Sequence, residues 1–421
     1  MSELAKSSCL TIDLGAGSGR VMSADWDGKT IELHEHHRFP NRMIQVGDRL
    51  HWDVLNLWQE CVDGLRKAAS GSRRSFRSVG VDTWALDYVL LSPSGEMLGL
   101  PRAYRDPRTS GKIEEITRYI PRGEIFRSTG LQFMEINTLC HLHAQSRENP
   151  ELLANAAHFL MIPDWFHWCL SGDISCEFTN ATTTQFLDPV ERRWSTSLLD
   201  RLNIPHHFLP PLTEPGTALA SILPSVSEST SLPAIPVIAP ATHDTASAVV
   251  AVPTDLTGSA SWAYLSSGTW SLVGIETPRH LLTQDVLDQN FTNEGGVDGT
   301  FRLLKNVMGM WLLQQLQAAL TEQGHPHTTA ELVQSAAIAD AFQSLIDPDA
   351  DVFLRPSDIT VTIQAECIRT GQPVPRTPGA FARCILESLA LRYRLVLQTL
   401  EQLTGSSLEV LHIVGGGSKN A

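Results

Sequence analysis

Three glycines near the amino terminus, at positions 15, 17 and 19, lie in the segment "DLGAGSGR" and could form a phosphate-binding loop. Small residues let backbone N–H groups approach phosphate oxygens, and successive amides form a concave anion-binding site. Asp13 precedes the loop, so its carboxylate could share a magnesium ion with the phosphate. A glycine-rich hairpin without a ligand is the alternative interpretation.

Two better-known phosphate-binding patterns do not fit this segment. The dinucleotide-binding pattern requires glycine where this chain has Arg20, and it requires a helix where "RVMSADWDGKTIELHEH" alternates like a strand. The P-loop pattern would need a glycine in place of Ser23, upstream of "GKT". The glycine loop is therefore expected between two strands, with a further turn at Asp27–Gly28.

Asp244, in the segment "ATHDTASA", is the best candidate for a catalytic carboxylate because it lies in or near the first turn of an expected helix. In phosphoryl transfer such a carboxylate orients the attacking hydroxyl and takes its proton. General-base catalysis of this kind contributes a factor of about 10²–10⁴ in rate. An ordinary N-capping aspartate is the alternative.

Two more small-residue turns follow, in "LSSGTWSLVG" (265–274) and "VGGGS" (414–418). Alone, the first could be a plain hairpin and the second a strand-to-helix connector. Together with the first loop they would supply two phosphate clamps and a surface for adenosine. The histidines of "HEHHR" (34–38) lack a third ligand and are better explained as a solvated strand face.

The expected elements place these turns between strands of two similar halves. Residues 9–15, 19–26 and 29–39 form a three-stranded meander, and 261–278 form a second hairpin of the same plan. The remaining expectations are a helix at 54–69, a strand at 78–92, a loop-rich connection at 209–240, helices at 303–320 and 379–405, and a strand at 408–414. This order fits the duplicated ribonuclease-H-like architecture of sugar kinases, actin and Hsp70, which is an analogy at the level of fold.

Composition narrows the class of protein. The formal charge of −14 argues against nucleic acid and against an anionic membrane surface as partners. No apolar stretch is long enough for a membrane helix, and "MSELAKSSC" carries no apolar signal core. Seven scattered cysteines without a CxxC pair predict free thiols in a reducing cytoplasm. The oligomeric state is left open.

The chain resembles the bacterial L-rhamnulose kinases of the FGGY carbohydrate kinase family over nearly its whole length. The resemblance rests on "DLGAGSGRVM", "LHWDV", "VDTWALDYVLL", "GLPRAYRDPRT", "MIPDWF", "EFTNATTTQ", "THDTASAV", "YLSSGTWSLVG", "NEGG", "LLKNVMGMWLLQ", "ARCILESLAL" and "LHIVGGG". It implies an α/β fold with two ribonuclease-H-like domains, of the actin, hexokinase and Hsp70 ATPase type, flanking a central cleft. Residues 1–250 would bind sugar and phosphate, and residues 251–421 would bind the nucleotide.

The activity implied by the resemblance is transfer of the ATP γ-phosphate to the 1-hydroxyl of L-rhamnulose, with Mg²⁺ as the cofactor. Asp244 would be the proton acceptor, and Asp13 would hold Mg²⁺ through water. The implied ATP contacts are Ala16, Gly17, Ser18, Gly19, Arg20, Thr269, Gln314 and Gly416. The implied sugar contacts are Ala85, His243, Asp244, Thr245 and Asn306.

Two features depart from the family. The family's "DTWG" is "DTWA" here, and the methyl group of Ala85 in a tight sugar pocket can change binding by about 1–3 kcal/mol. Family members also continue for several dozen residues beyond the GGG turn, whereas this sequence ends at Ala421. Two alternatives therefore stay open: a kinase for another ketose, or a truncated chain that binds sugar or nucleotide without turnover.

Overall fold

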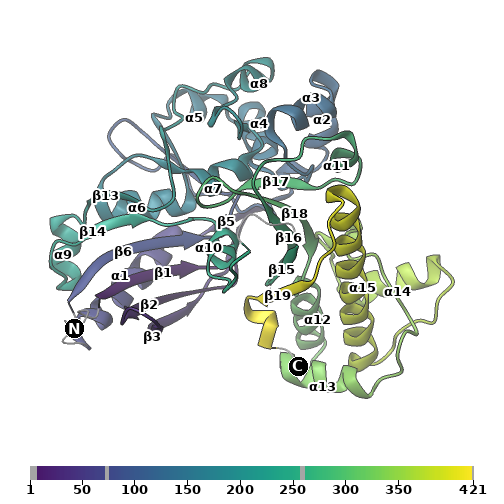
Figure 1. Ribbon diagram of the computed structural model, residues 1–421. Helices are drawn as coiled ribbons and strands as arrows, with labels where there is room; N and C mark the ends of the chain where they lie inside the picture. Colours follow the sequence, from purple (N-terminus) through teal and green to yellow (C-terminus); the bar gives the residue numbers. More distant parts are fainter. Residues whose placement is uncertain (1–6, 72–74, 257–260, 420–421) are drawn as a thin grey trace. The chain divides into compact units, whose positions relative to one another are not determined.

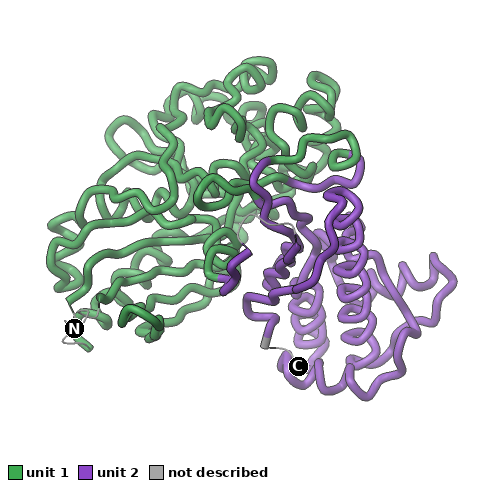
Figure 2. The backbone as a smooth tube through the Cα atoms, in the orientation of Figure 1, with its two compact units in different colours: residues 1–251, 280–287, 293–301 green, residues 252–279, 288–292, 302–421 purple. Residues whose placement is uncertain are grey.

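The computed structural model describes residues 7–71, 75–256 and 261–419, which form two compact units (Figure 2). Unit 1 comprises residues 1–251, 280–287 and 293–301, and unit 2 comprises residues 252–279, 288–292 and 302–421. The chain thus alternates between the units after residue 279. Residues 1–6 of the amino-terminal segment "MSELAKSSC", and residues 257–260 near the expected domain boundary, lie outside the described residues.

Unit 1 is built on a six-stranded sheet with the strand order β13-β14-β6-β1-β2-β3 (Figure 1). Its strands are β1 (Ser7–Leu14), β2 (Ser18–Trp26), β3 (Ile31–Pro40), β6 (Phe76–Thr83), β13 (Thr217–Ser221) and β14 (Pro236–Ala239). β1 pairs antiparallel with β2 and parallel with β6. This arrangement confirms the predicted meander, and it brings the carboxyl ends of β1 and β6 to the same edge of the sheet.

Helix α1 (Val54–Ser70) shows how the sequence covers this sheet. It begins where the Asp53 side chain accepts a hydrogen bond from the Asn56 N–H at 3.1 Å, and its apolar residues recur at helical spacing. The helix packs against β2 and β3. Gly64 makes the close approach possible, because a Cβ at this position would overlap the Val21 side chain.

The second sheet repeats the plan of the first. In unit 2 the order β18-β16-β15-β19 unites β15 (Trp262–Ser267), β16 (Trp270–Thr277), β18 (Phe301–Met308) and β19 (Val410–Val414). β15 pairs antiparallel with β16 and parallel with β19, as β1 does with β2 and β6. The repeat confirms the duplicated ribonuclease-H-like architecture. Helix α15 (Pro378–Thr404) packs against β16 and against α12 (Trp311–Glu322).

Two sequence expectations are wrong. Residues 303–308, expected as the start of a helix, belong to strand β18, and the helix α12 begins only at Trp311. The strand is buried along most of its length, so its apolar run reflects a central strand of a sheet. The proline-rich stretch 209–240, expected as a loop-rich connection, supplies strands β13 and β14 to the first sheet.

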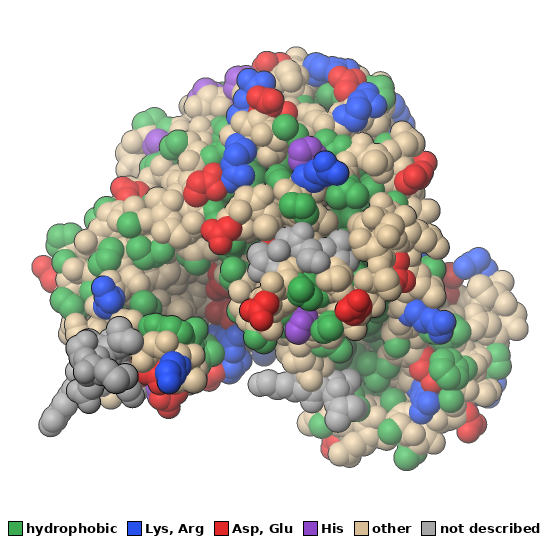
Figure 3. Space-filling view, in the orientation of Figure 1, with side chains coloured by type: hydrophobic (Ala, Val, Ile, Leu, Met, Phe, Trp, Pro, Cys, Tyr) green, Lys and Arg blue, Asp and Glu red, His purple; other side chains and the backbone are tan. Residues whose placement is uncertain are grey.

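The other elements complete the two units. They are β4 (Met43–Val46), β5 (Arg49–Trp52), β7 (Tyr88–Leu91), β8 (His158–Met161), β9 (Cys176–Glu177), β10 (Leu187–Asp188), β11 (Arg193–Trp194), β12 (Leu212–Thr213), β17 (Thr292–Gly295), α2 (Lys112–Tyr119), α3 (Arg122–Thr129), α4 (Thr138–Glu148), α5 (Pro150–Ala154), α6 (Ile162–Ser171), α7 (Phe178–Ala181), α8 (Thr196–Arg201), α9 (Pro224–Thr230), α10 (Asp244–Val250), α11 (Gln284–Asp288), α13 (Thr329–Ile338) and α14 (Ile359–Arg369). No helix in the described part of the chain combines the length and apolar character needed to cross a membrane. All seven cysteines are free thiols. On the face shown in Figure 3, basic side chains stand among acidic ones.

Candidate functional site

The first glycine loop connects β1 to β2, as the sequence predicts. At its two ends, Asp13 and Arg20 are directly opposite each other in the β1–β2 pair, and the Arg20 Nε donates to the Asp13 carboxylate at 2.7 Å. Asn41 fixes the loop itself, since its side-chain amide donates to the Gly15 carbonyl at 2.9 Å. Gly17 and Ser18, at the tip, are exposed to solvent. The sequence interpretation missed Asn41 because it lies beyond β3.

The glycine at position 19 has a packing role. Gly19 is buried, and a Cβ there would overlap the Phe39 ring and approach the Leu14 side chain to 2.7 Å. The pattern "GAGSG" therefore combines an exposed loop with a buried contact. Spacing alone does not separate these two reasons for glycine.

Three carboxylates from three elements meet at the edge where β1 and β6 end. Asp13 on β1 and Asp82 on β6 are partners in the parallel strand register. The charge of Asp13 acts on both Asp82 and Asp244, and the charge of Asp244 acts on Asp82. Burial raises the pKa of Asp82 well above its usual range, and the negative charges of Asp13 and Asp244 raise it further. Asp82 lies in the quoted "VDTWALD" motif, but the sequence interpretation gave it no role.

Asp244 begins helix α10, as predicted, with His243 as the residue before the first turn. Partial removal from water raises the pKa of Asp244, while the neighbouring His243 lowers it and Asp13 raises it again. The Thr245 hydroxyl donates to the Asp244 carboxylate at 3.2 Å. A carboxylate with a raised pKa is a stronger base toward a hydroxyl proton, provided that it is ionised.

Glu177 holds the segment that carries these residues. Its buried carboxylate accepts hydrogen bonds from the Thr242 N–H at 2.9 Å and the Thr242 hydroxyl at 2.7 Å. It also accepts from the N–H and hydroxyl of Thr179, at 2.8 and 2.6 Å. The Thr242 carbonyl in turn accepts from the Thr83 N–H at 2.9 Å, which ties the segment to the end of β6.

Ala85 lies in a constrained turn after β6. The next residue, Leu86, has a φ of +78°, which is unfavourable for a bulky side chain and is frequent at functional sites. Asp87 stabilises the turn by accepting hydrogen bonds from the indoles of Trp52 at 2.6 Å and Trp84 at 2.8 Å. Burial raises the pKa of Asp87 to about 7, although both indole hydrogen bonds lower it.

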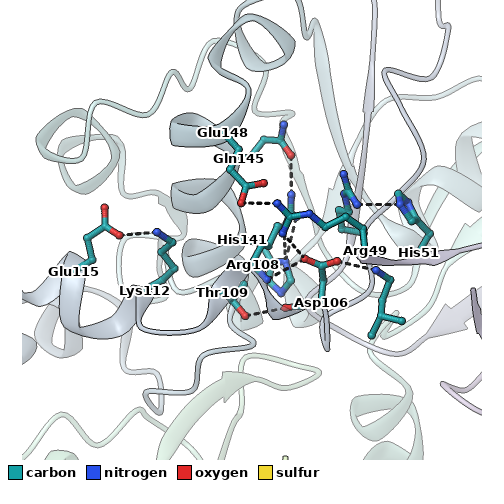
Figure 4. Close-up of polar contacts among 12 residues, drawn as sticks. Arg49, His51, Asp106, Arg108, Thr109, Lys112, Glu115, His141, Gln145 and Glu148 are labelled. Atoms are coloured by element: carbon teal, nitrogen blue, oxygen red, sulfur yellow. Dashed lines mark hydrogen bonds and ion pairs between the residues drawn. The ribbon is translucent and has the colours of Figure 1, made fainter. Parts of the chain in front are cut away.

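The "GLPRAYRDPRT" motif forms a polar network in unit 1 (Figure 4). Asp106 is fully buried and accepts from the Leu50 N–H at 2.7 Å and the Arg108 N–H at 3.0 Å. Arg108 donates to the Gln145 side chain on α4 at 2.7 Å and to the His141 ring at 3.1 Å. The motif thus joins β5 to α4, and its buried charges are explained by structure.

In unit 2, the other two glycine turns lie together. The turn after β15 accepts hydrogen bonds from the start of α12, since the Thr269 carbonyl accepts from the Trp311 N–H at 3.1 Å. The GGG turn contacts the same strand end, because a Cβ at Gly415 would lie 2.6 Å from the Ser267 carbonyl. Gly416 faces open space. Two further predicted contacts lie in unit 2, namely Gln314, exposed on α12, and Asn306, partly buried on β18.

The donor set suits a magnesium ion that keeps most of its water. Among the described residues, no group of three or more His, Cys, Asp and Glu side chains could hold a metal ion. Asp13 is 29% exposed and lies beside the phosphate loop. Mg²⁺ retains several waters and binds through one or two carboxylates plus phosphate oxygens, so the site fits that ion. Among the histidines of residues 34–38, the His37 ring contacts the Glu60 carboxylate at 2.5 Å, and the His36 ring contacts the Ser23 hydroxyl at 2.9 Å.

The duplicated fold, with glycine turns after the first strand of each sheet and a carboxylate at a helix start, is the arrangement expected of an ATP-dependent phosphotransferase. Two family models match the chain: the N-terminal domain of the FGGY family of carbohydrate kinases over residues 8–251, and the C-terminal domain of the same family over residues 263–421. The chain therefore belongs to the FGGY family of carbohydrate kinases.

Within this family, the chain is similar to curated rhamnulokinases. The chain is 41% identical to the rhamnulokinase of Bacteroides thetaiotaomicron over 99% of this chain and 84% of that protein. It is 43% identical to the rhamnulokinase of Pectobacterium atrosepticum over 99% of this chain and 82% of that protein.

Solved structures confirm the fold. The ligand-bound xylulose kinase of Lactobacillus acidophilus superposes with a TM-score of 0.77 at 14% identity, over 98% of this chain and 82% of that one. The Plasmodium falciparum glycerol kinase with ADP superposes with a TM-score of 0.73 at 15% identity, over 99% of this chain and 83% of that one.

Proposed function

We propose that this protein phosphorylates L-rhamnulose at its 1-hydroxyl, using ATP and giving L-rhamnulose 1-phosphate and ADP. The observation that carries the proposal is an identity of 41–43% to two rhamnulokinases across 99% of the chain. The proximity of Asp13, Asp82 and Asp244 at one edge of the sheet supports it, because phosphoryl transfer needs a base and a metal ligand close together. We infer further that the reaction takes place in the cytoplasm.

Asp244 acts as the general base. Its carboxylate accepts the proton of the sugar 1-hydroxyl while that oxygen attacks the γ-phosphorus. The new bond joins the sugar oxygen to phosphorus, and the bond between phosphorus and the β,γ-bridging oxygen breaks, so ADP carries away the electron pair. Ala85, His243, Thr245 and Asn306 orient the ketose.

The nucleotide is held by both glycine-turn systems. In this proposal the loop residues Ala16 to Arg20 bind phosphate oxygens, and Arg20 exchanges its contact with Asp13 for one with phosphate. Thr269, Gln314 and Gly416 bind the nucleotide from residues 251–421, while residues 1–250 bind the sugar. Mg²⁺ bound near Asp13 would neutralise the developing charge on the phosphate oxygens.

Replacement of Asp244 by Asn tests the mechanism. We expect ADP formation in the presence of L-rhamnulose to fall by a factor of at least about 10², within the range that general bases contribute, while ATP binding is retained. Asp285 provides a matched control, since it is an exposed first-turn aspartate of α11. Asp285→Asn should leave the rate unchanged. Near-normal turnover by Asp244→Asn would contradict the assignment of the base.

A further inference from the structure

The "NEGG" motif contains a further carboxylate, that of Glu294, which lies next to His243. Asn293 anchors the motif in unit 1, because its side-chain amide donates to the Gly130 carbonyl at 3.2 Å and the Leu281 carbonyl at 3.0 Å. Gly295 fixes the other side, since its N–H donates to the Thr182 hydroxyl at 2.8 Å and a Cβ there would lie 2.6 Å from the Phe178 ring. The residue between them is held firmly in the interior.

That residue, Glu294, faces His243. The Glu294 carboxylate lies 3.2 Å from the His243 Nδ1, and both side chains are nearly inaccessible, at 4% and 6% exposure. On the other side of the ring, the His243 Nε2 lies 3.4 Å from the Asp244 carboxylate. The imidazole therefore lies between two carboxylates, one buried and one 37% exposed.

The backbone of His243 is fixed independently of Glu294. Its N–H faces the Thr179 hydroxyl at 3.4 Å, its carbonyl accepts from the Ser247 N–H at 3.0 Å, and it forms a β-bridge with Thr83. What Glu294 determines is thus the orientation of the ring and the placement of its protons. An ionised carboxylate can accept hydrogen bonds but cannot donate them. An imidazole between two ionised carboxylates therefore satisfies both by carrying a proton on each nitrogen.

We propose that Glu294 is a positioning residue for phosphoryl transfer, which holds His243 in its doubly protonated form with Nε2–H directed at Asp244. The inference rests on the proposed function and deepens it. The three side chains then alternate in charge as negative, positive and negative, which keeps the carboxylate of Asp244 ionised and oriented. Glu294 acts through His243 and need not touch the sugar.

The charges around Asp244 explain why this matters. Asp244 lies close to Asp82 on β6, and to Asp13 on β1, the residue that would hold Mg²⁺. The guanidinium of Arg20 on β2 is already engaged by Asp13 at 2.6 Å. His243 is the neighbour that lowers the pKa of Asp244. In this proposal, removal of the Glu294 charge removes the interaction that stabilises the second proton on the His243 ring.

The test combines a spectrum with kinetics. In protein labelled with ¹⁵N-histidine, we expect the two ring nitrogens of His243 to show the shifts of a doubly protonated imidazole at neutral pH, assigned with His243→Gln. In Glu294→Gln the ring should become neutral, and kcat with L-rhamnulose should fall about 10- to 100-fold while KM for ATP changes less than about twofold. In the same variant, the acid limb of the plot of kcat against pH should move to higher pH.

A matched control is available in the same unit. Glu115 and the buried His143 form a pair of the same kind, 3.0 Å apart on α2 and α4. Glu115→Gln should leave kcat and its pH profile unchanged. A neutral His243 ring in the unmodified protein would overturn the proposal, and so would a Glu294→Gln variant with normal kcat and pH profile. The spectrum needs no substrate, so a failure of the sugar assignment alone would leave the His243 result intact.

Discussion

Glu177 offers the sharpest mutational test of how the proposed base is positioned. Its carboxylate receives two hydrogen bonds from Thr179 and two from Thr242, the residue two positions before Asp244. Replacement by Gln keeps the volume and one acceptor oxygen but places an NH₂ group where Oε2 accepts three of these bonds. The hydroxyls can rotate and accept, whereas the Thr242 N–H cannot.

The expected loss of stability follows from the number of hydrogen bonds that Glu177→Gln removes or weakens. One buried N–H left without an acceptor costs about 1–3 kcal/mol, and weakening of the remaining bonds to a charged group brings the total to about 2–4 kcal/mol. At roughly 2–4 °C per kcal/mol for a unit of this size, the melting temperature should fall by about 4–16 °C. Because displacement of a catalytic group by about 1 Å can cost about 10²-fold, kcat should fall by about 10- to 100-fold.

Thermal unfolding and steady-state kinetics of Glu177→Gln measure both effects. Thr242→Val serves as the graded comparison, since it removes only the hydroxyl bond and keeps the Thr242 N–H bond to Glu177. It should cost about 1 kcal/mol, the typical net value of one hydrogen bond. A Glu177→Gln protein with unchanged melting temperature and unchanged kcat would refute the argument that this carboxylate holds the Asp244 segment.

Three further predictions follow from the site. Because burial raises the pKa of Asp87 to about 7, its folded form binds a proton between about pH 4 and 7 that the unfolded chain releases, so stability should fall as pH rises through this window. Asp87→Asn should flatten that slope in urea unfolding measured at several pH values, and an unchanged slope would contradict it. Gly19→Ala should lower stability by about 1–3 kcal/mol through overpacking against Phe39, as chemical unfolding would reveal. Asp13→Asn should weaken the apparent affinity for the divalent metal about tenfold, with KM for the sugar unchanged. Titration of the reaction rate with Mg²⁺ and titration with Mn²⁺ followed by paramagnetic resonance would both measure this affinity.

The meander, the second hairpin and the helix start at Asp244 could all be predicted because each depends on local pattern. Alternation in residues 7–26 and turn residues between apolar runs determine strands without long-range information. Residues 303–308 could not be assigned in this way. A short apolar run fits a buried strand and a helix equally well, and the neighbouring strand β16 decides the outcome.

The candidate site divides along the same line. Glycine turns and a carboxylate before a helix are visible in sequence, but the partners that tune them are distant. Glu177 lies 65 positions from Thr242, and Glu294 reaches His243 only through the fold. Gly19 shows the converse difficulty, since its spacing indicates phosphate binding while its burial under Phe39 supplies a packing reason.

The most direct test of the account is ADP release by the purified chain with Mg²⁺ and ATP, in the presence of L-rhamnulose, L-fuculose, D-xylulose or glycerol. We predict ADP formation with L-rhamnulose at a rate well above that with the other three acceptors, accompanied by L-rhamnulose 1-phosphate in equal amount. A folded protein that forms ADP equally fast without any sugar, or that prefers another acceptor, would contradict it.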